Sequence, residues 1–239
     1  MTVQFDDYGE AAASARDLTE LSGRYAIQAS AERLVAADVA HKLNLLPDND
    51  FLEIGCGAGN QLIPLSFRCR GATGIDHPKL IKRLNDRYQA ANLKGIGSNF
   101  LTWQAEQKFD RILVYSVLHA LPDRDTVFAF VDKALGVLRD DGAMLLGDLN
   151  NIGKKRRFSE SEQGKQFATE WEAQMAAYGG PQDVTISSGG VQFDDELVME
   201  LLLHVRKKGF HSYLLPQQKD LPFGRTREDI LVQGPEYQG

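Results

Sequence analysis

The sequence predicts a doubly wound α/β fold of three layers, in which helices cover both faces of a mostly parallel, seven-stranded sheet. Two observations lead to this prediction. Short apolar segments alternate with segments of helical periodicity through residues 30–149. The short segments are also almost continuously apolar, which is typical of strands that are buried on both faces of a parallel sheet.

The first half of the pattern alternates helices and strands. Residues 30–46 carry apolar side chains three and four positions apart, as on one face of a helix. The next expected elements are a strand at residues 51–54, a helix at 60–70, a strand at 72–75 and a helix at 78–92. Pro64 has to lie in the first turns of its helix, where a missing backbone N–H is tolerated.

The pattern continues to residue 149 and then changes. The expected elements are a strand at 109–117, a helix at 126–139, a strand at 143–147, helices at 162–178 and 194–208, and strands at 210–215 and 228–232. Gly209 follows the last helix at the position where a left-handed cap is common. Only a dozen residues without helical periodicity separate the final two strands, so an antiparallel pair is expected at one end of the sheet.

Composition and charge exclude several classes of protein. With 239 residues, of which 43% are apolar and 25% charged, the chain is expected to hold one domain with additions, or at most two. The net charge of −6 disfavours a general nucleic-acid binder. Cys56 and Cys69 are too few for a disulfide framework or a four-cysteine zinc site. No apolar run approaches the ~18 residues of a membrane helix, and the acidic N-terminal stretch does not resemble a signal peptide, so a soluble cytoplasmic protein is expected.

A glycine-rich turn is the most informative feature of the sequence. Gly55, Gly57 and Gly59 directly follow the apolar strand at residues 51–54. Glycines at a strand-to-helix turn let the backbone approach a ligand closely. Asp76 ends the second strand, where a carboxylate can accept hydrogen bonds from two ribose hydroxyls. The two features together predict a cofactor that contains a nucleoside.

The details of this turn favour one cofactor over another. The dinucleotide pattern G-x-G-x-x-G/A requires Gly or Ala at the position of Asn60. Glu53 would lie unfavourably close to a pyrophosphate, whereas it can attract a cation. S-adenosylmethionine carries both a sulfonium and an ammonium group, so the charge favours this cofactor. An NAD(P)-dependent oxidoreductase and a non-catalytic cofactor-binding module remain the alternatives.

Residues 46–149 resemble the class I (Rossmann-like) S-adenosylmethionine-dependent methyltransferases. The resemblance is carried by the E-x-G-x-G-x-G pattern that begins at Glu53, by Asp76 and by residues 109–121. It implies that the turn contacts the methionine part of the cofactor and that Asp76 binds the ribose. Asn99 stands where the family commonly has an acid near the adenine, and its amide oxygen can still accept a hydrogen bond. The cofactor-binding residues expected from the resemblance are Glu53, Gly55, Cys56, Gly57, Gly59, Asp76, His77, Asn99, Phe100, Tyr115 and Ser116.

Two residues are candidates for catalysis. His119 lies just past the strand at 109–117, and its imidazole can be neutral at pH 7 and act as a general base. The alternative is that His119 only packs against or caps the next helix. Asp148 ends the fifth strand, where open α/β sheets bind ligands, and is an alternative base or acceptor-binding group. A metal is not expected, because Tyr115 stands where catechol-type methyltransferases have an acid.

The methyl acceptor is expected to be a small molecule that is anionic or hydroxylated. The basic run at residues 154–157 lies next to the predicted acceptor site, and Lys154, Arg156 and Arg157 are its candidate contacts. A solvated loop is the alternative. Residues 147–158 also resemble methyltransferases associated with bacterial surface-polysaccharide gene clusters, which suggests a sugar or nucleotide-sugar acceptor. No nucleic-acid or membrane partner is expected, and the chain is a monomer or a homodimer.

Four segments are expected around this site. They are a helical extension over the cofactor site (1–46), the S-adenosylmethionine-binding core (47–149), an insertion or lid (150–195), and a helix with a strand pair that completes the sheet (196–239). In the family, such an N-terminal extension often folds over the cofactor, which makes Tyr8, Arg24 and Tyr25 further acceptor-binding candidates. Aromatic and apolar side chains in the helix at 162–178 form a stripe that belongs either to the core or to a lid.

Overall fold

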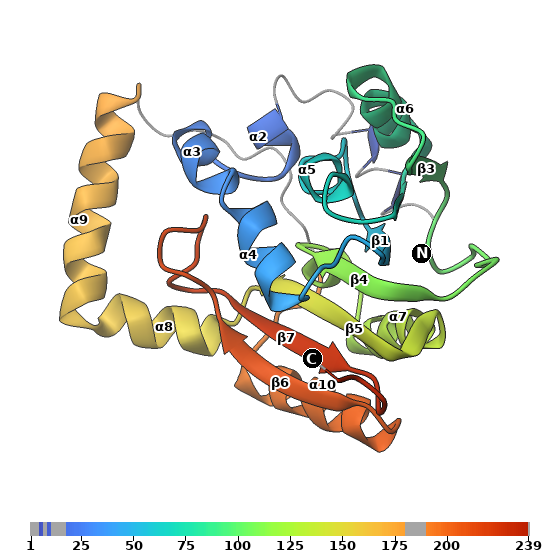
Figure 1. The fold of residues 1–239 in the computed structure, drawn as a ribbon. Coiled ribbons are helices and arrows are strands. Elements are labelled where there is room, and N and C mark those ends of the chain that lie inside the picture. Colours follow the sequence, from blue (N-terminus) through green and yellow to red (C-terminus); the bar gives the residue numbers. More distant parts are fainter. Residues whose placement is uncertain (1–4, 7–8, 11–17, 180–189, 239) are drawn as a thin grey trace.

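A computed structural model describes residues 5–6, 9–10, 18–179 and 190–238 (Figure 1). Its centre is a seven-stranded sheet with the order β3-β2-β1-β4-β5-β7-β6. The strands are β1 (Asp50–Ile54), β2 (Gly71–Asp76), β3 (Leu93–Gly97), β4 (Phe109–Tyr115), β5 (Leu138–Leu149), β6 (His211–Pro216) and β7 (Glu228–Gln233). β1 to β5 are parallel, whereas β7 runs antiparallel to both β5 and β6. The predicted α/β fold and its antiparallel end pair are confirmed.

Helices cover both faces of this sheet (Figure 1). The described residues include the helices α2 (Leu18–Leu21), α3 (Ala29–Glu32), α4 (Val35–Lys42), α5 (Leu62–Ser66), α6 (Pro78–Arg87), α7 (Arg124–Gly136), α8 (Ile152–Glu160), α9 (Glu162–Ala177) and α10 (Asp195–Lys207). On one face, Val131 of α7 and Leu201 of α10 share a buried cluster with Ile112. On the other face, Val39 of α4 clusters with Leu113. Adjacent residues of β4 therefore enter two different cores, which explains the continuous apolar character of the strand.

The sequence pattern did not predict strand β3. It lies at the edge of the sheet, pairs only with β2, and leaves Leu93 and Ile96 half-buried. A strand with this exposure has little apolar periodicity. Its Gly95 lies under α6, where an added Cβ would come within 2.9 Å of Ile81 Cγ2. The close packing of α6, rather than hydrophobicity, defines this edge.

One helical prediction is wrong in detail, and one helix was not predicted. Residues 30–46 form two short helices instead of one, because the chain turns at Arg33 and Leu34 and leaves Leu34 48% exposed. α4 then directs Val35 and Val39 into the core. The basic run, for which a solvated loop was the alternative, lies in α8, and Asn151 caps this helix by accepting hydrogen bonds from Gly153 N at 2.9 Å and Lys154 N at 3.2 Å.

No helix among the described residues is long and apolar enough to cross a membrane.

The left-handed cap predicted at Gly209 is confirmed by a φ of +92°, and nothing lies within 4 Å of a Cβ placed there. We expect Gly209→Ala to lower the free energy of unfolding by about 1 kcal/mol through backbone strain alone. Gly136 of α7 has equal space but no positive φ, so Gly136→Ala is expected to raise this free energy by about 0.5 kcal/mol. Urea denaturation of both variants measures the difference, and equal effects would contradict the strain argument.

Candidate active site

A cavity of about 780 Å³ lies at the carboxyl ends of the parallel strands. Its sheet-side wall is formed by residues 54–58 at the end of β1, Asp76 of β2, residues 98–101 after β3 and residues 115–117 at the end of β4. Segments that lie outside the sheet close the opposite side. They contribute residues 21–25, Asn150, Phe223 and Arg227 to the lining. Ligands of open α/β sheets bind at this edge.

The glycine turn is shaped by two different constraints. Gly55 has a φ of +81°, and a Cβ there would come within 2.3 Å of Val117 Cγ2. Gly57 has a φ of +54° and nothing within 4 Å of an added Cβ. The first glycine is therefore needed for packing between β1 and β4, whereas the second is needed for its backbone conformation beside the cavity. Gly59 does not line the cavity and packs against Leu84.

Asp76 joins this turn to the end of β2. Its Oδ2 accepts a hydrogen bond from Gly57 N at 2.7 Å, and its Oδ1 accepts one from His77 N at 2.6 Å. Burial raises the pKa of Asp76 to about 6, although both backbone hydrogen bonds oppose this shift. His77 does not line the cavity but caps α6, where its Nδ1 accepts from Lys79 N at 3.3 Å.

Glu53 is a buried acid with an unsatisfied oxygen. Its side chain lines the cavity, and no described residue forms a hydrogen bond with Oε2. Burial, followed by the negative charge of Asp76, raises the pKa of Glu53 well above its usual value. An unpaired buried carboxyl group is costly, so this site fits a ligand that brings a cation or a hydrogen-bond donor. Burial also raises the pKa of the neighbouring Cys56 thiol well above its usual value, so this thiol stays protonated.

The segment after β3 forms the next part of the wall. Phe100 is buried and packs against Phe130, with the ring centroids 4.9 Å apart. Asn99 lines the cavity, but its Oδ1 already accepts a hydrogen bond from Leu101 N at 2.9 Å. An amide oxygen has two lone pairs, so one acceptor position remains on Asn99 Oδ1.

Asn60 links the glycine turn to the N-terminal helices. Its Nδ2 donates hydrogen bonds to Leu18 O at 2.9 Å and to Glu32 Oε1 at 3.2 Å. Asn60, which stands where the dinucleotide pattern requires Gly or Ala, therefore holds α2 and α3 beside the turn.

At the other end of the cavity lie the exits of β4 and β5. Tyr115 lines the cavity, and its hydroxyl accepts a hydrogen bond from Gln217 Nε2 at 3.2 Å. His119 also lines the cavity, and burial lowers its pKa to about 4. The imidazole is therefore neutral near pH 7 and free of positive charge.

Asp148 lies behind this wall and is completely buried. Its Oδ2 accepts hydrogen bonds from Arg24 Nη2 at 2.7 Å and from Ser116 Oγ at 2.6 Å. Burial alone would raise the pKa of Asp148, but the positive charges of Arg24 and Arg227 outweigh it and hold the pKa at about 2. Ser116 and Asp148 have φ values of 60° and 62°, so backbone strain at both strand ends accompanies their contact.

The ring of Phe223 contacts two arginines at the same end of the cavity. The guanidinium carbons of Arg24 and Arg227 each lie 5.2 Å from the centre of the Phe223 ring. Tyr25 contacts Phe223 edge-on, with centroids 6.0 Å apart, and contacts Trp171 of α9 at 5.6 Å. Sequence reasoning missed Phe223 and Arg227, because the loop between β6 and β7 carries no recognisable motif.

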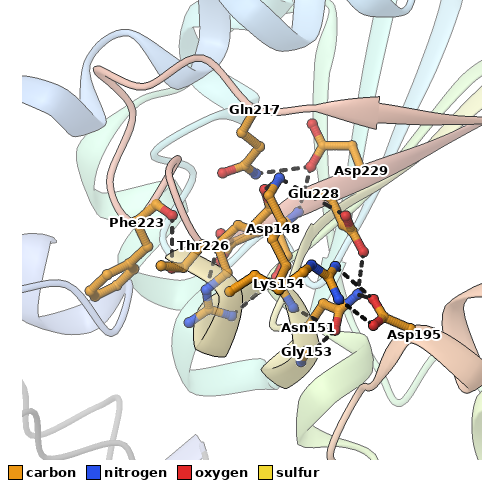
Figure 2. A network of polar contacts seen from close by, with 12 residues as sticks. Asp148, Asn151, Gly153, Lys154, Asp195, Gln217, Phe223, Thr226, Glu228 and Asp229 are labelled. Carbon is orange, nitrogen blue, oxygen red and sulfur yellow. Dashed lines mark hydrogen bonds and ion pairs between the residues drawn. The ribbon is translucent and has the colours of Figure 1, made fainter. Parts of the chain in front are cut away.

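The structure separates the basic run from the cavity. Lys154, Arg156 and Arg157 do not line it. Lys154 Nζ donates to the Arg227 carbonyl at 2.5 Å, and Arg157 pairs with Asp195 at 2.9 Å (Figure 2). Arg156 is exposed to solvent. Tyr8, also named from the sequence, lies outside the described residues.

Comparisons with known proteins agree with this geometry. Residues 51–142 match the family described as a methyltransferase domain. Nodulation protein S of Sinorhizobium fredii is 30% identical over 112 residues, which cover 46% of this chain and 52% of that protein. Chondramide synthase cmdD of Chondromyces crocatus is 28% identical over 146 residues, 58% of this chain but 4% of that protein. The chain thus spans about half the length, or far less, of these curated relatives.

Solved structures show the same fold over nearly the whole chain. N-methyltransferase NodS of Bradyrhizobium japonicum WM9, in complex with S-adenosyl-L-homocysteine, has a TM-score of 0.62 at 16% identity and covers 98% of this chain and 99% of its own. The DhpI-SAM-HEP complex has a TM-score of 0.64 at 15% identity and covers 97% of each chain. Residues 51–142, which include the glycine turn and Asp76, thus match a methyltransferase domain, and the chain shares the fold of these solved structures.

Proposed function

We propose that the chain transfers the methyl group of S-adenosylmethionine to a small molecule that is anionic or hydroxylated, with a sugar or nucleotide sugar as one candidate. The observation that carries this proposal is that one continuous cavity contains both groups of residues. It connects the glycine turn and Asp76 at one end with His119, Arg24 and Tyr25 at the other. One cavity with two chemically different ends suits a cofactor and an acceptor that must meet.

The cofactor end supplies groups for each part of S-adenosylmethionine. Asp76 would accept hydrogen bonds from the ribose hydroxyls. Glu53 Oε2, which has no hydrogen bond from the described residues, would accept from the ammonium group beside the glycine turn. Asn99 and Phe100 would hold the adenine by a hydrogen bond and by apolar contact.

The acceptor end supplies positioning and a base. S-adenosylmethionine brings an electrophilic methyl group on a sulfonium, and the acceptor atom has to lie in line with it. His119 is neutral and lines the cavity, so it would take the proton of an acceptor hydroxyl. The pKa of Asp148 at about 2 and its contact with Arg24 suit a positioning residue better than a base.

Cofactor binding tests the proposal directly. At 100 times its dissociation constant, S-adenosyl-L-homocysteine is expected to stabilise the folded protein by about 2.7 kcal/mol, because it binds only the folded state. NAD and NADP at the same concentration are expected to leave the melting temperature unchanged. Thermal unfolding measures both effects, and a shift with a dinucleotide but none with S-adenosyl-L-homocysteine would refute the proposal.

The pKa of Asp76 predicts how cofactor affinity depends on pH. Below pH 6 the carboxyl gains a proton and loses acceptor capacity for the ribose, so affinity falls as pH decreases. With a pKa of about 6, the affinity for S-adenosyl-L-homocysteine is expected to be about tenfold weaker at pH 5 than at pH 7. Calorimetric titration measures this ratio. Asp76→Asn is expected to bind weakly at both pH values, and a flat profile in the unaltered protein would contradict the assigned role.

Loss of the base is expected to affect turnover rather than cofactor binding. His119→Gln should lower the turnover number about 100-fold or more for an oxygen acceptor, since no other neutral base lines this end among the described residues. Its affinity for S-adenosyl-L-homocysteine should be unchanged. The control is His204→Gln, because His204 pairs with Asp132 on α7, away from the cavity. Steady-state kinetics with an acceptor found by screening measure the turnover number of both variants. If His119→Gln turns over as fast as His204→Gln, His119 has only a structural role.

A further inference from the structure

The acceptor end of the cavity presents two guanidinium groups and, among the described residues, no carboxylate. Arg24 and Arg227 line the cavity, whereas Asp148, their shared acidic neighbour, lies behind them. The acids that do line it are Glu32, Glu53 and Asp76. Glu53 and Asp76 belong to the cofactor end. Glu32 accepts its hydrogen bond from Asn60, the residue that follows the glycine turn.

Both guanidinium groups have donors to spare. Toward the described residues Arg24 uses only Nη2, which donates to Ser116 Oγ at 2.8 Å and to Asp148 Oδ2 at 2.7 Å. Arg227 uses only Nη1, which donates to the Asp148 carbonyl at 3.3 Å, while its Nε stays 3.9 Å from Asp148 Oδ1. A guanidinium has five N–H donors. Most of those on Arg24 and Arg227 therefore find no hydrogen-bond acceptor among the described residues.

The two side chains are held in place by the residues around them. Phe223 packs against both guanidinium groups and adopts a strained φ of 59°. The turn after it is closed by hydrogen bonds from Thr226 to the Phe223 carbonyl, and Lys154 Nζ donates to the Arg227 carbonyl (Figure 2). Lys154 of the basic run thus helps to fix the backbone of Arg227. Such preorganisation is what a binding site for a charged group requires.

We propose that Arg24 and Arg227, which both contact Phe223, bind an oxyanion of the methyl acceptor, either a carboxylate or a phosphate. The planar fork of arginine matches both groups through two parallel hydrogen bonds. This inference rests on the proposed function and narrows it, because the acceptor is then an anion rather than a neutral hydroxylated molecule. The atom that receives the methyl group lies between the anchored oxyanion and the cofactor, on the side of His119.

Anion binding to the protein saturated with S-adenosyl-L-homocysteine tests this proposal. Acetate and inorganic phosphate are titrated calorimetrically in separate experiments at constant ionic strength, so that the two arms distinguish carboxylate from phosphate. At least one is expected to bind. Arg227→Gln should weaken that binding about tenfold or more, since it removes charge-assisted hydrogen bonds. Arg225→Gln is the matched control, because Arg225 contacts Phe158 and Phe167 and does not line the cavity.

Each outcome decides the proposal. No binding of either anion, unchanged binding in Arg227→Gln, or equal weakening in Arg225→Gln would overturn it. Arg227→Lys keeps the positive charge beside Asp148 but lacks the planar guanidinium. It replaces the glutamine variant if that variant does not fold, and we expect it to bind the anion several-fold more weakly than the unaltered protein. The thermal shift with S-adenosyl-L-homocysteine, measured on the same proteins, distinguishes failure of the methyltransferase proposal from failure of the oxyanion site. Loss of that shift in the unaltered protein refutes the methyltransferase proposal, whereas a retained shift without anion binding refutes only the oxyanion site.

Discussion

The buried charge of Asp148 is the constraint on which the rest of this site depends. A carboxylate that is completely buried must be paired, and removal of its partner would cost about 3–5 kcal/mol. The partner is Arg24, which is 124 positions away in the sequence. The Asp148 backbone N–H also donates to Asp229 Oδ1 on β7 at 2.8 Å, and Asp229 pairs with Lys42 of α4 at 2.7 Å. Asp148 therefore ties the N-terminal segment to the centre of the sheet through its carboxylate, and the antiparallel strand pair through its backbone N–H.

This constraint also explains how the two ends of the cavity differ. At the cofactor end, acids line the wall and retain free acceptor capacity, as Glu53 Oε2 shows. At the acceptor end, Asp148 does not line the cavity; its Oδ2 pairs with Arg24, and its Oδ1 lies 3.9 Å from Arg227 Nε without a hydrogen bond from the described residues. The wall that remains is cationic and aromatic. A cation such as a sulfonium and an anionic acceptor would thus be drawn to opposite ends of one cavity, which places the methyl group between them.

The two helices of the insertion after β5 support the cavity wall but do not line it. α8 and α9 extend beside the body of the molecule (Figure 1). Trp171 of α9 contacts Tyr25, which in turn contacts Phe223. Lys154 of α8 holds the Arg227 backbone. The aromatic stripe of α9 is half-buried at Phe167 and Trp171, so it is neither a core nor a free surface. Through these contacts α8 and α9 stabilise Arg24 and Arg227, and no residue of either helix lines the cavity.

The sequence by itself determined the alternating order of strands and helices, the antiparallel end pair and the glycine turn with Asp76. These features are local, because each depends on the spacing of residues within one or two neighbouring elements. It did not determine β3, whose edge position removes the apolar signal.

Only the tertiary structure decided the acceptor end. Arg24, Ser116, Asp148 and Arg227 come from four separate parts of the chain, and hydrogen bonds between them give no periodic pattern in any one part. The sequence named Arg24 as one acceptor-binding candidate, but it placed most of the positive charge near the acceptor at residues 154–157, which do not line the cavity. The fold instead presents single arginines from distant loops to the cavity, because a buried carboxylate selects its partners by position in space and not by proximity in the chain.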